Sequence, residues 1–194
     1  SASVPLPNNI LTWHISATLM RYDQEKQIYI AEEGVELSGG SIRLQADHVT
    51  FSNVTRNVTA SGHVLLKSNQ DTIRCDRLAL NLENETGTLY NGIVFIEENH
   101  FFIQGDTIRK TGKKSYEAER AAITTCPGED PDWKISARNV VVTIEGYGIA
   151  RDATLWAKNI PALYSPIVAF PVKNRRQTGL LTPRITSSNR KGME

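Results

Sequence analysis

The sequence predicts an all-β protein, a twisted antiparallel β-jelly roll built from strand-turn-strand repeats. Three observations support this fold class: a short apolar motif recurs along the chain, apolar and polar residues alternate with a period of two inside it, and turn-forming residues follow it at a constant phase. Lys and Arg total 22 against 21 Asp and Glu, with both signs scattered. This balance gives no basic surface of the kind that binds nucleic acid.

The chain has 194 residues, of which 40% are hydrophobic. A chain of this length can bury roughly 70% of its surface on folding, which suffices for one sizeable core. The repeats fill residues 1–158, and four prolines in 159–194, three of them five residues apart, mark a change of composition. We therefore expect a jelly-roll domain over 1–158 and a Pro-rich linker over 159–194. No apolar run approaches the roughly 20 residues of a membrane-spanning helix.

The repeated motif consists of an apolar residue, any residue, a small residue, two further residues, and then two apolar positions separated by one other. A helix does not keep such a set on one side, whereas a β-bulge after the small residue does. The small residue recurs at 17, 46, 75 and 105, and again at 118 and 137. The six copies are Ile15–Tyr22, Leu44–Phe51, Ile73–Leu80, Ile103–Lys110, Tyr116–Ile123 and Ile135–Val142.

A second strand returns after each turn, and its apolar pairs have the same spacing as the motif. These pairs are Val35/Leu37, Val64/Leu66 and Val94/Ile96, which stand 29 and 30 residues apart. Units of this kind stack to bury a shared apolar face. A β-solenoid is the rival architecture to the jelly roll.

Catalytic chemistry is not expected, because the sequence contains no phosphate loop, no nucleophile elbow and no His-Glu metal helix. We expect neither a cofactor nor a metal. The four histidines, which alternate with apolar positions or fall near turns, should face solvent: His14, His48, His63 and His100. One position after the small residue, Asp47, Asp76 and Asp106 recur in register. They are interpreted as bulge residues, with a calcium-binding row as the alternative.

The two cysteines have different surroundings in the sequence. Cys75 occupies the small inward position of its repeat, so we expect a buried, unreactive thiol. Cys126 lies in the turn sequence Thr-Thr-Cys-Pro-Gly, where it could be a free thiol or half of a long-range disulfide. Pairing between Cys75 and Cys126 stays open.

The C-terminal part carries the most specific motifs. Pro161-x-x-Tyr164-x-Pro166 is followed by Pro171, and then by the run Arg176-x-Thr-Gly-Leu-Leu-x-Pro183. Together with Thr-Cys shortly before Trp133 and the repeats, these motifs make the chain resemble the LptD (OstA/Imp) family of lipopolysaccharide-assembly outer-membrane proteins. The likeness covers nearly the whole chain.

The resemblance implies a periplasmic jelly roll that precedes an outer-membrane β-barrel, with residues 159–194 forming the linker and the start of the barrel and the rest of the barrel absent from this sequence. It also implies lipopolysaccharide as ligand, an LptA-like bridge protein and the plug lipoprotein LptE as partners, and a disulfide from Cys126 to the barrel. The family's other N-terminal cysteine has no counterpart here, and Cys75 matches no family position. A soluble LptA-like bridge is the alternative function, and a structural β-solenoid is a second.

Lipopolysaccharide acyl chains are expected in a groove formed by the inward apolar row. The edge that receives a strand of the bridge protein is expected around Leu11, Trp13, Ile15 and Ala17. The residues predicted to line the groove are Trp13, Ile15, Leu19, Leu44, Val49, Phe51, Val64, Leu66, Ile73, Leu78, Leu80, Val94, Ile96, Ile103 and Ile135.

Overall fold

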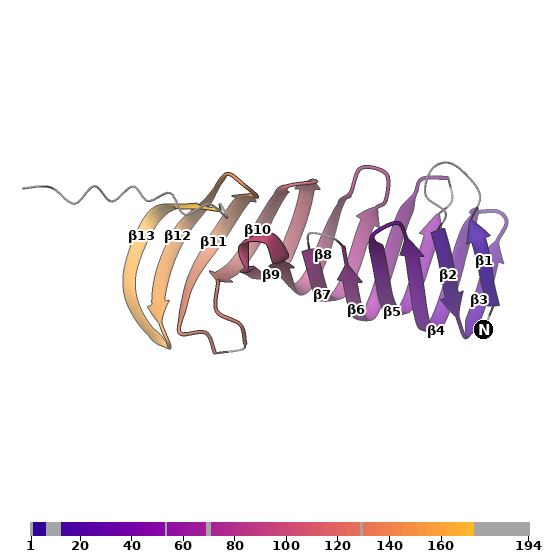
Figure 1. Cartoon of the computed structure of the whole chain (residues 1–194), viewed down its shortest axis with the longest axis horizontal. Coiled ribbons are helices and arrows are strands. Elements are labelled where there is room, and N and C mark those ends of the chain that lie inside the picture. The colour runs from indigo at the N-terminus through magenta and orange to yellow at the C-terminus, as the bar shows by residue number, and fades with distance from the viewer. Residues whose placement is uncertain (1, 7–12, 53, 69–70, 129, 173–194) are drawn as a thin grey trace, which may run out of the picture.

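The computed structural model describes residues 2–6, 13–52, 54–68, 71–128 and 130–172. These residues form a single 13-stranded sheet in which strands adjacent in sequence pair antiparallel. The order is β1-β2-β4-β5-β6-β7-β8-β9-β10-β11-β12-β13, with β3 paired to β4 beside β2. The strands lie side by side along the long axis of the molecule (Figure 1). The predicted antiparallel fold is confirmed, and the up-and-down order rules out the β-solenoid.

Most strands have ten to twelve residues, about the length of one predicted repeat half. The strands are β1 Ala2–Leu6, β2 Trp13–Ala17, β3 Leu19–Asp23, β4 Ile28–Gly39, β5 Ile42–Ser52, β6 Asn57–Lys67, β7 Asp71–Asn81, β8 Thr86–Ile96, β9 Phe101–Gly112, β10 Ser115–Thr124, β11 Trp133–Thr143, β12 Tyr147–Ala157 and β13 Ile160–Pro171. A 3-10 turn, η1 Glu97–Asn99, joins β8 to β9.

Each long strand of the repeats is interrupted near its middle, where the regular pairing skips residues. On β5 and β6, for example, Gln45 pairs with Leu65 and the next pair is His48 with Ser61. The interruption falls directly after the small residue of the motif, where the sequence predicts a bulge. The register shifts by one residue at this level in the β4–β5, β5–β6 and β6–β7 pairs, as in a bulge, and is unchanged across the interruption from β7–β8 onward. The extra residues allow the apolar residues on both sides of the interruption to point to the same side of the sheet.

The residue opposite each bulge has a left-handed backbone. Positive φ occurs at His63 (47°), Asn91 (49°), Arg120 (47°) and Asp152 (50°), one on each even strand from β6 to β12. Non-glycine residues adopt this conformation at an energetic cost, and Asn and Asp tolerate it best. These four residues lie at one level of the sheet and mark the line along which it bends.

Bending along this line folds the sheet into two facing layers, with the apolar residues between them. The β4–β5, β6–β7 and β8–β9 turns form one rim, called rim A, and the β5–β6, β7–β8 and β9–β10 turns form the other, rim B. The place where the two rims meet is called the seam. One buried cluster fills the space between the layers, from Ile15 through Phe51, Leu78 and Ile108 to Val140.

The sheet continues beyond residue 158. Strand β13 pairs with β12 from Ala157 opposite Ile160 to Tyr147 opposite Pro171. Because β13 is the last strand in the order, its prolines lie on an edge strand, where a missing N–H is tolerated. The domain boundary at 158 stays a prediction, but the residues after it are not all linker.

Gly92 supports the close approach of β8 to β7 at the bend. A Cβ there would lie 2.7 Å from Cβ of Cys75 and 2.9 Å from the carbonyl oxygen of Arg74, whereas a Cβ at Gly112 meets nothing within 4 Å. We predict that Gly92→Ala lowers the free energy of unfolding by about 1–3 kcal/mol. Urea denaturation measures it. Gly112→Ala is the matched control, and an equal effect of both changes would refute the packing argument.

Candidate functional site: an apolar interior with a polar seam

The predicted apolar row lies mostly between the two layers. Twelve of the fifteen residues are buried in the core cluster, and Leu80 and Ile135 pack against it while partly exposed. The exposed fractions of Ile15, Phe51, Val94 and Ile103 are all 0%. The row is therefore continuous along the roll, but its two sides are in contact. The twelve buried residues are Trp13, Ile15, Leu44, Val49, Phe51, Val64, Leu66, Ile73, Leu78, Val94, Ile96 and Ile103.

Leu19 is the exception, and its assignment to the groove is wrong. It is 53% exposed, whereas its neighbour Met20 packs against the core. The break after Ala17 separates β2 from β3, so the inward face of β3 begins at Met20. Leu19 therefore points to the outside of the sheet.

The predicted partner edge is also wrong. Strand β2, which contains Trp13, Ile15 and Ala17, pairs with β1 on one side and with β4 on the other. Leu11 lies outside the described residues. Among the described strands at this end, β1 and β3 each have a single neighbour, so they form the free edge. The repeats could not predict the pairing of residues 2–6 with residues 13–17, because β1 precedes the first copy of the motif.

The recurring aspartates are bulge residues, and each binds the left-handed residue on the next strand. Asp47 accepts a hydrogen bond from His63 at 2.8 Å, and Asp76 accepts one from Asn91 at 3.1 Å. Asp106 forms an ion pair with Arg120 at 2.6 Å, and the order of charges is reversed in the pair Arg138 and Asp152 at 3.4 Å. We call this row of pairs the bend ladder. It accounts for the recurrence of the aspartates without a bound calcium ion. Among the described residues no group of three acidic, His or Cys side chains could hold a metal.

All four histidines face solvent, as predicted. The hydrogen bond to the Asp47 carboxylate, followed by its charge, raises the pKa of His63 above the ordinary 6.5. The bond therefore favours protonated His63, and the Asp47–His63 pair adds most to folding when the imidazole is charged.

Cys75 and Cys126 are both free thiols. Cys75 is buried at the bend of β7, as predicted, and burial together with the nearby Asp76 carboxylate raises the pKa of its thiol to about 11. Such a thiol is largely protonated at neutral pH and reacts slowly. Cys126 is half-buried after the end of β10, and its backbone N–H donates to the Thr124 hydroxyl.

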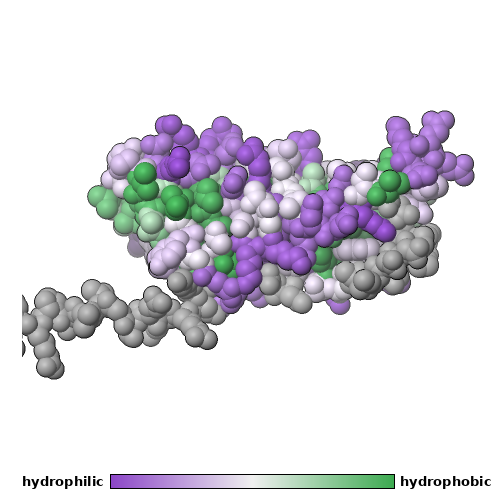
Figure 2. Space-filling view, turned by 90° about the horizontal axis from the view of Figure 1, so that it is seen from above, coloured by the Kyte–Doolittle hydropathy of each residue, from purple (hydrophilic) through white to green (hydrophobic). Residues whose placement is uncertain are grey.

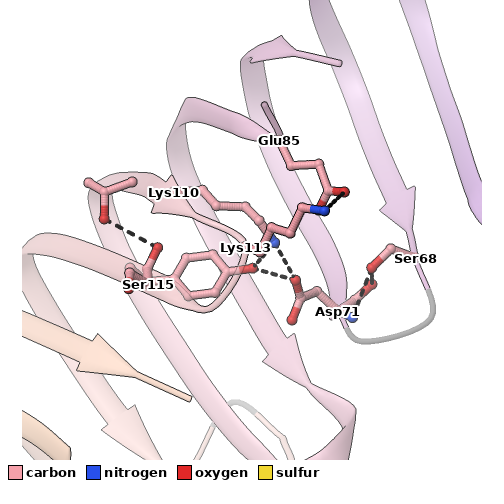
Figure 3. Close-up of polar contacts among 8 residues, drawn as sticks. Ser68, Asp71, Glu85, Lys110, Lys113 and Ser115 are labelled. Carbon is pink, nitrogen blue, oxygen red and sulfur yellow. Dashed lines mark hydrogen bonds and ion pairs between the residues drawn. The ribbon is translucent and has the colours of Figure 1, made fainter. Parts of the chain in front are cut away.

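A buried polar cluster joins the two rims across the seam. Asp71 begins β7 on rim A and is 1% exposed. Its Oδ2 accepts a hydrogen bond from Lys110 Nζ on rim B at 2.8 Å and another from the Tyr116 hydroxyl, and Lys110 also donates to that hydroxyl at 2.9 Å (Figure 3). Burial and the Asp71 charge raise the pKa of Tyr116. We call these three residues the seam cluster.

Sequence reasoning missed the seam cluster as a site. The signal was Lys110, a charged residue at an inward position that is Phe51 or Leu80 in other copies. Its partner Asp71 lies 39 residues earlier at the opposite end of a strand. A repeat pattern reveals neighbours along the sheet but not contacts across its fold.

Two cavities and one groove accompany these residues. A cavity of about 280 Å³ lies beneath the seam cluster. A second, of about 230 Å³, lies near the C-terminal end, where Phe101 on rim A stacks on Phe170 of β13 with ring centroids 5.8 Å apart. The groove, of about 1080 Å³, follows the bend ladder and is lined by polar residues such as Arg74 and Gln104.

The last strand exposes apolar side chains on both of its faces. Ile160, Leu163, Tyr164 and Ile167 of β13 are between 61% and 70% exposed. Figure 2 shows the hydrophobic surface gathered at the end of the molecule that carries this strand. Exposed apolar surface of this kind is uncommon unless another surface covers it. Among the described residues no helix has the length and apolarity to cross a membrane.

The fold and the site define an elongated antiparallel β roll with a continuous apolar interior. No family model matches the chain. It is 28% identical to the LPS-assembly protein LptD of Saccharophagus degradans over 99% of this chain and 22% of the relative. It is 33% identical to LptD of Acinetobacter baumannii over 82% and 20%, and 31% identical to LptD of Nitrosomonas eutropha over 93% and 25%.

The chain thus fits an N-terminal segment of LptD, and the resemblance predicted from the sequence is confirmed. It spans about a fifth to a quarter of the length of these curated relatives. Among solved structures it is similar to LptH of Pseudomonas aeruginosa, described as the LptA homologous periplasmic component of a lipopolysaccharide transport device. That likeness has 12% identity and a TM-score of 0.30, and covers 81% of this chain and 93% of LptH.

The seam cluster should respond differently to single and double substitution. Lys110→Met leaves the Asp71 carboxylate buried without its ion-pair partner, and we predict a loss of about 3–5 kcal/mol in the free energy of unfolding. Asp71→Leu combined with Lys110→Met replaces the pair with apolar groups and should restore part of that loss, because the buried Tyr116 hydroxyl still lacks both of its partners. Thermal and urea unfolding measure both variants. A double variant no more stable than Lys110→Met would contradict the prediction.

The pKa of His63 should fall when Asp47 is neutralised. Because the folded pKa is raised, the stability that the pair adds is present below pH 6.5 and is lost as the pH rises through the folded pKa. NMR titration of the imidazole in Asp47→Asn should give a pKa near the ordinary value. Asp76→Asn, which removes only a weaker and more distant charge, should lower the pKa less; equal shifts would rule out the hydrogen bond as the main cause.

Proposed function

We propose that this chain is the periplasmic module of an outer-membrane lipopolysaccharide translocon. It receives lipopolysaccharide from a periplasmic bridge protein, holds the acyl chains between its two layers, and passes them towards a β-barrel that inserts the lipid into the outer leaflet. The observation that supports this most is the continuous buried apolar row from β2 to β12. Lipopolysaccharide is proposed as the ligand because the relatives are named LPS-assembly proteins.

An interior of this kind removes the main barrier to moving such a lipid. Exposing one methylene to water costs about 0.8 kcal/mol, so a chain of roughly ten methylenes costs about 8 kcal/mol. A roll lined with aliphatic side chains replaces water along the whole path. Sugars and phosphates, which are costly to bury, stay outside the roll.

Loading requires the two layers to separate, because the side chains of the row are in contact across the interior. The seam is the place where this separation costs least in backbone hydrogen bonds, since side chains join the rims there while the bend is continuous sheet. Acyl chains then enter between rim A and rim B and leave the polar head outside. The module binds and transfers the lipid without covalent chemistry.

The two ends of the sheet give the transfer its direction. The free edge formed by β1 and β3 can accept a strand of an LptA-like bridge by β-augmentation, which extends the apolar interior from one protein into the next. At the other end, the exposed apolar side chains of β13 are suited to contact the barrel and its plug lipoprotein LptE. Cys126, half-buried and free, is available for a disulfide to the barrel.

Site-specific photo-crosslinking tests the interior path. A photoreactive residue at Leu44 or Leu80, which face the interior, should capture lipopolysaccharide in cells that assemble the full-length protein. At Arg43 or Arg74, which are exposed on the outer face of the same strands, it should capture little. Each pair shares its strand, which makes the arginines matched controls. Equal yields at inner and outer positions would refute the proposal that acyl chains lie between the two layers.

A further inference from the structure

The cavity beneath the seam cluster combines an aliphatic wall with a polar end. Its wall is formed by leucines and isoleucines of β6, β7 and β8, and residues from both rims close its mouth. Those at the polar end are Asp71 and Lys110. The aliphatic residues are Leu66, Ile73, Leu78, Leu80 and Leu89.

Its size suits a single alkyl segment. At about 280 Å³ the cavity has room for roughly nine atoms of the size of a water molecule, which occupies about 30 Å³ in the liquid. A cavity with an aliphatic wall favours a methylene chain over polar contents. The polar end therefore decides which chain fits.

The hydrogen-bonding capacity of the seam cluster is only partly used. Oδ2 of Asp71 accepts from Lys110 and Tyr116, but Oδ1 is buried and has no hydrogen-bond partner among the described residues. Lys110 donates two hydrogen bonds within the cluster, and an ammonium group has three to donate. One unpartnered acceptor and one unused donor thus belong to two residues that line the same end of an aliphatic cavity.

We propose that the seam cavity is a binding site for an alkyl chain that carries a hydroxyl group. The hydroxyl donates its proton to Asp71 Oδ1 and accepts the remaining N–H of Lys110, so that one small group satisfies both. The chain lies along the leucines. The site deepens the proposed function by adding a polar recognition point to an apolar path.

Other head groups fit this end less well. A carboxylate or phosphate could accept from Lys110, but in its ionised form it has no proton to donate to Asp71 Oδ1 and would bring a second negative charge beside it. Of the two further lysines that line the mouth, Lys113 lies 3.9 Å from Glu85 and Lys114 is paired with Glu145. A plain alkane would leave Oδ1 unpaired, at the cost of a buried unsatisfied acceptor.

The test compares two probes on the 194-residue chain: octan-1-ol and its methyl ether, 1-methoxyoctane, which lacks the donor. Leucine methyl groups labelled with ¹³C report binding by NMR. We expect shifts at Leu78 and Leu89, and none at Leu37, which does not line the cavity. The alcohol should bind at least about tenfold more tightly than the ether, as expected for a hydrogen bond to a charged group.

The double variant Asp71→Leu with Lys110→Met removes the charged pair from the polar end and keeps the aliphatic wall. Alcohol and ether should then bind about equally, because the remaining Tyr116 hydroxyl can donate to the oxygen of either probe. A double substitution of the exposed pair Arg109 and Glu119, which lies 3.1 Å apart, is the matched control and should keep the preference for the alcohol. The comparison in the unsubstituted chain stands even if the double variant does not fold.

Three results would overturn the inference: equal binding of alcohol and ether to the unsubstituted chain, shifts at leucines away from the cavity, or a preference that survives in the double variant. None of these results bears on the proposed lipid path between the layers, which is tested separately by capture of lipopolysaccharide at Leu44 and Leu80. Conversely, failed capture together with a preserved alcohol preference would refute the proposed function and leave the cavity site standing.

Discussion

The interruption in the middle of each strand is the constraint on which the rest of the structure depends. A flat sheet of these strands would expose its apolar face to water. The interruption after the small residue, with a left-handed residue on the neighbouring strand, bends the sheet at one level and brings that face together. The interior, the bend ladder and the seam all follow from this bend. The cost of positive φ at residues such as His63 and Arg120 is offset locally, because each of these side chains binds the carboxylate facing it.

The sequence alone predicted those features of the fold that repeat from unit to unit. The small residue before two spacer positions predicted the bulge, and its filling by Cys75 predicted a buried thiol. Features without a repeat could not be found in this way. The β1–β2 pairing lies outside the repeats, and the strand that contains the prolines extends the sheet only because an edge position needs no donor at Pro161. The exposure of Leu19 depends on where the first bulge breaks the strand.

The seam cluster shows why a polar group can persist in an apolar interior. A buried ion pair adds little net stability compared with apolar residues of the same size, but loss of one partner is expensive. The Asp71–Lys110 contact therefore favours one alignment of the two rims over slipped alternatives more than it strengthens the closed roll. Such a contact can be exchanged for contacts with a ligand at small net cost, which an apolar contact such as Phe101 with Phe170 cannot do.

The simple order of the strands has a mechanical consequence. Extensive contacts join each strand only to its neighbours in the sheet, so the folding free energy is close to a sum of terms between adjacent hairpins. A roll of this kind can fray from either end without disturbing its centre, and backbone amides should exchange with solvent fastest in β1 and β13 and slowest near β7 and β8. The two ends that are free to meet other proteins are thus also the parts that can rearrange at the lowest cost.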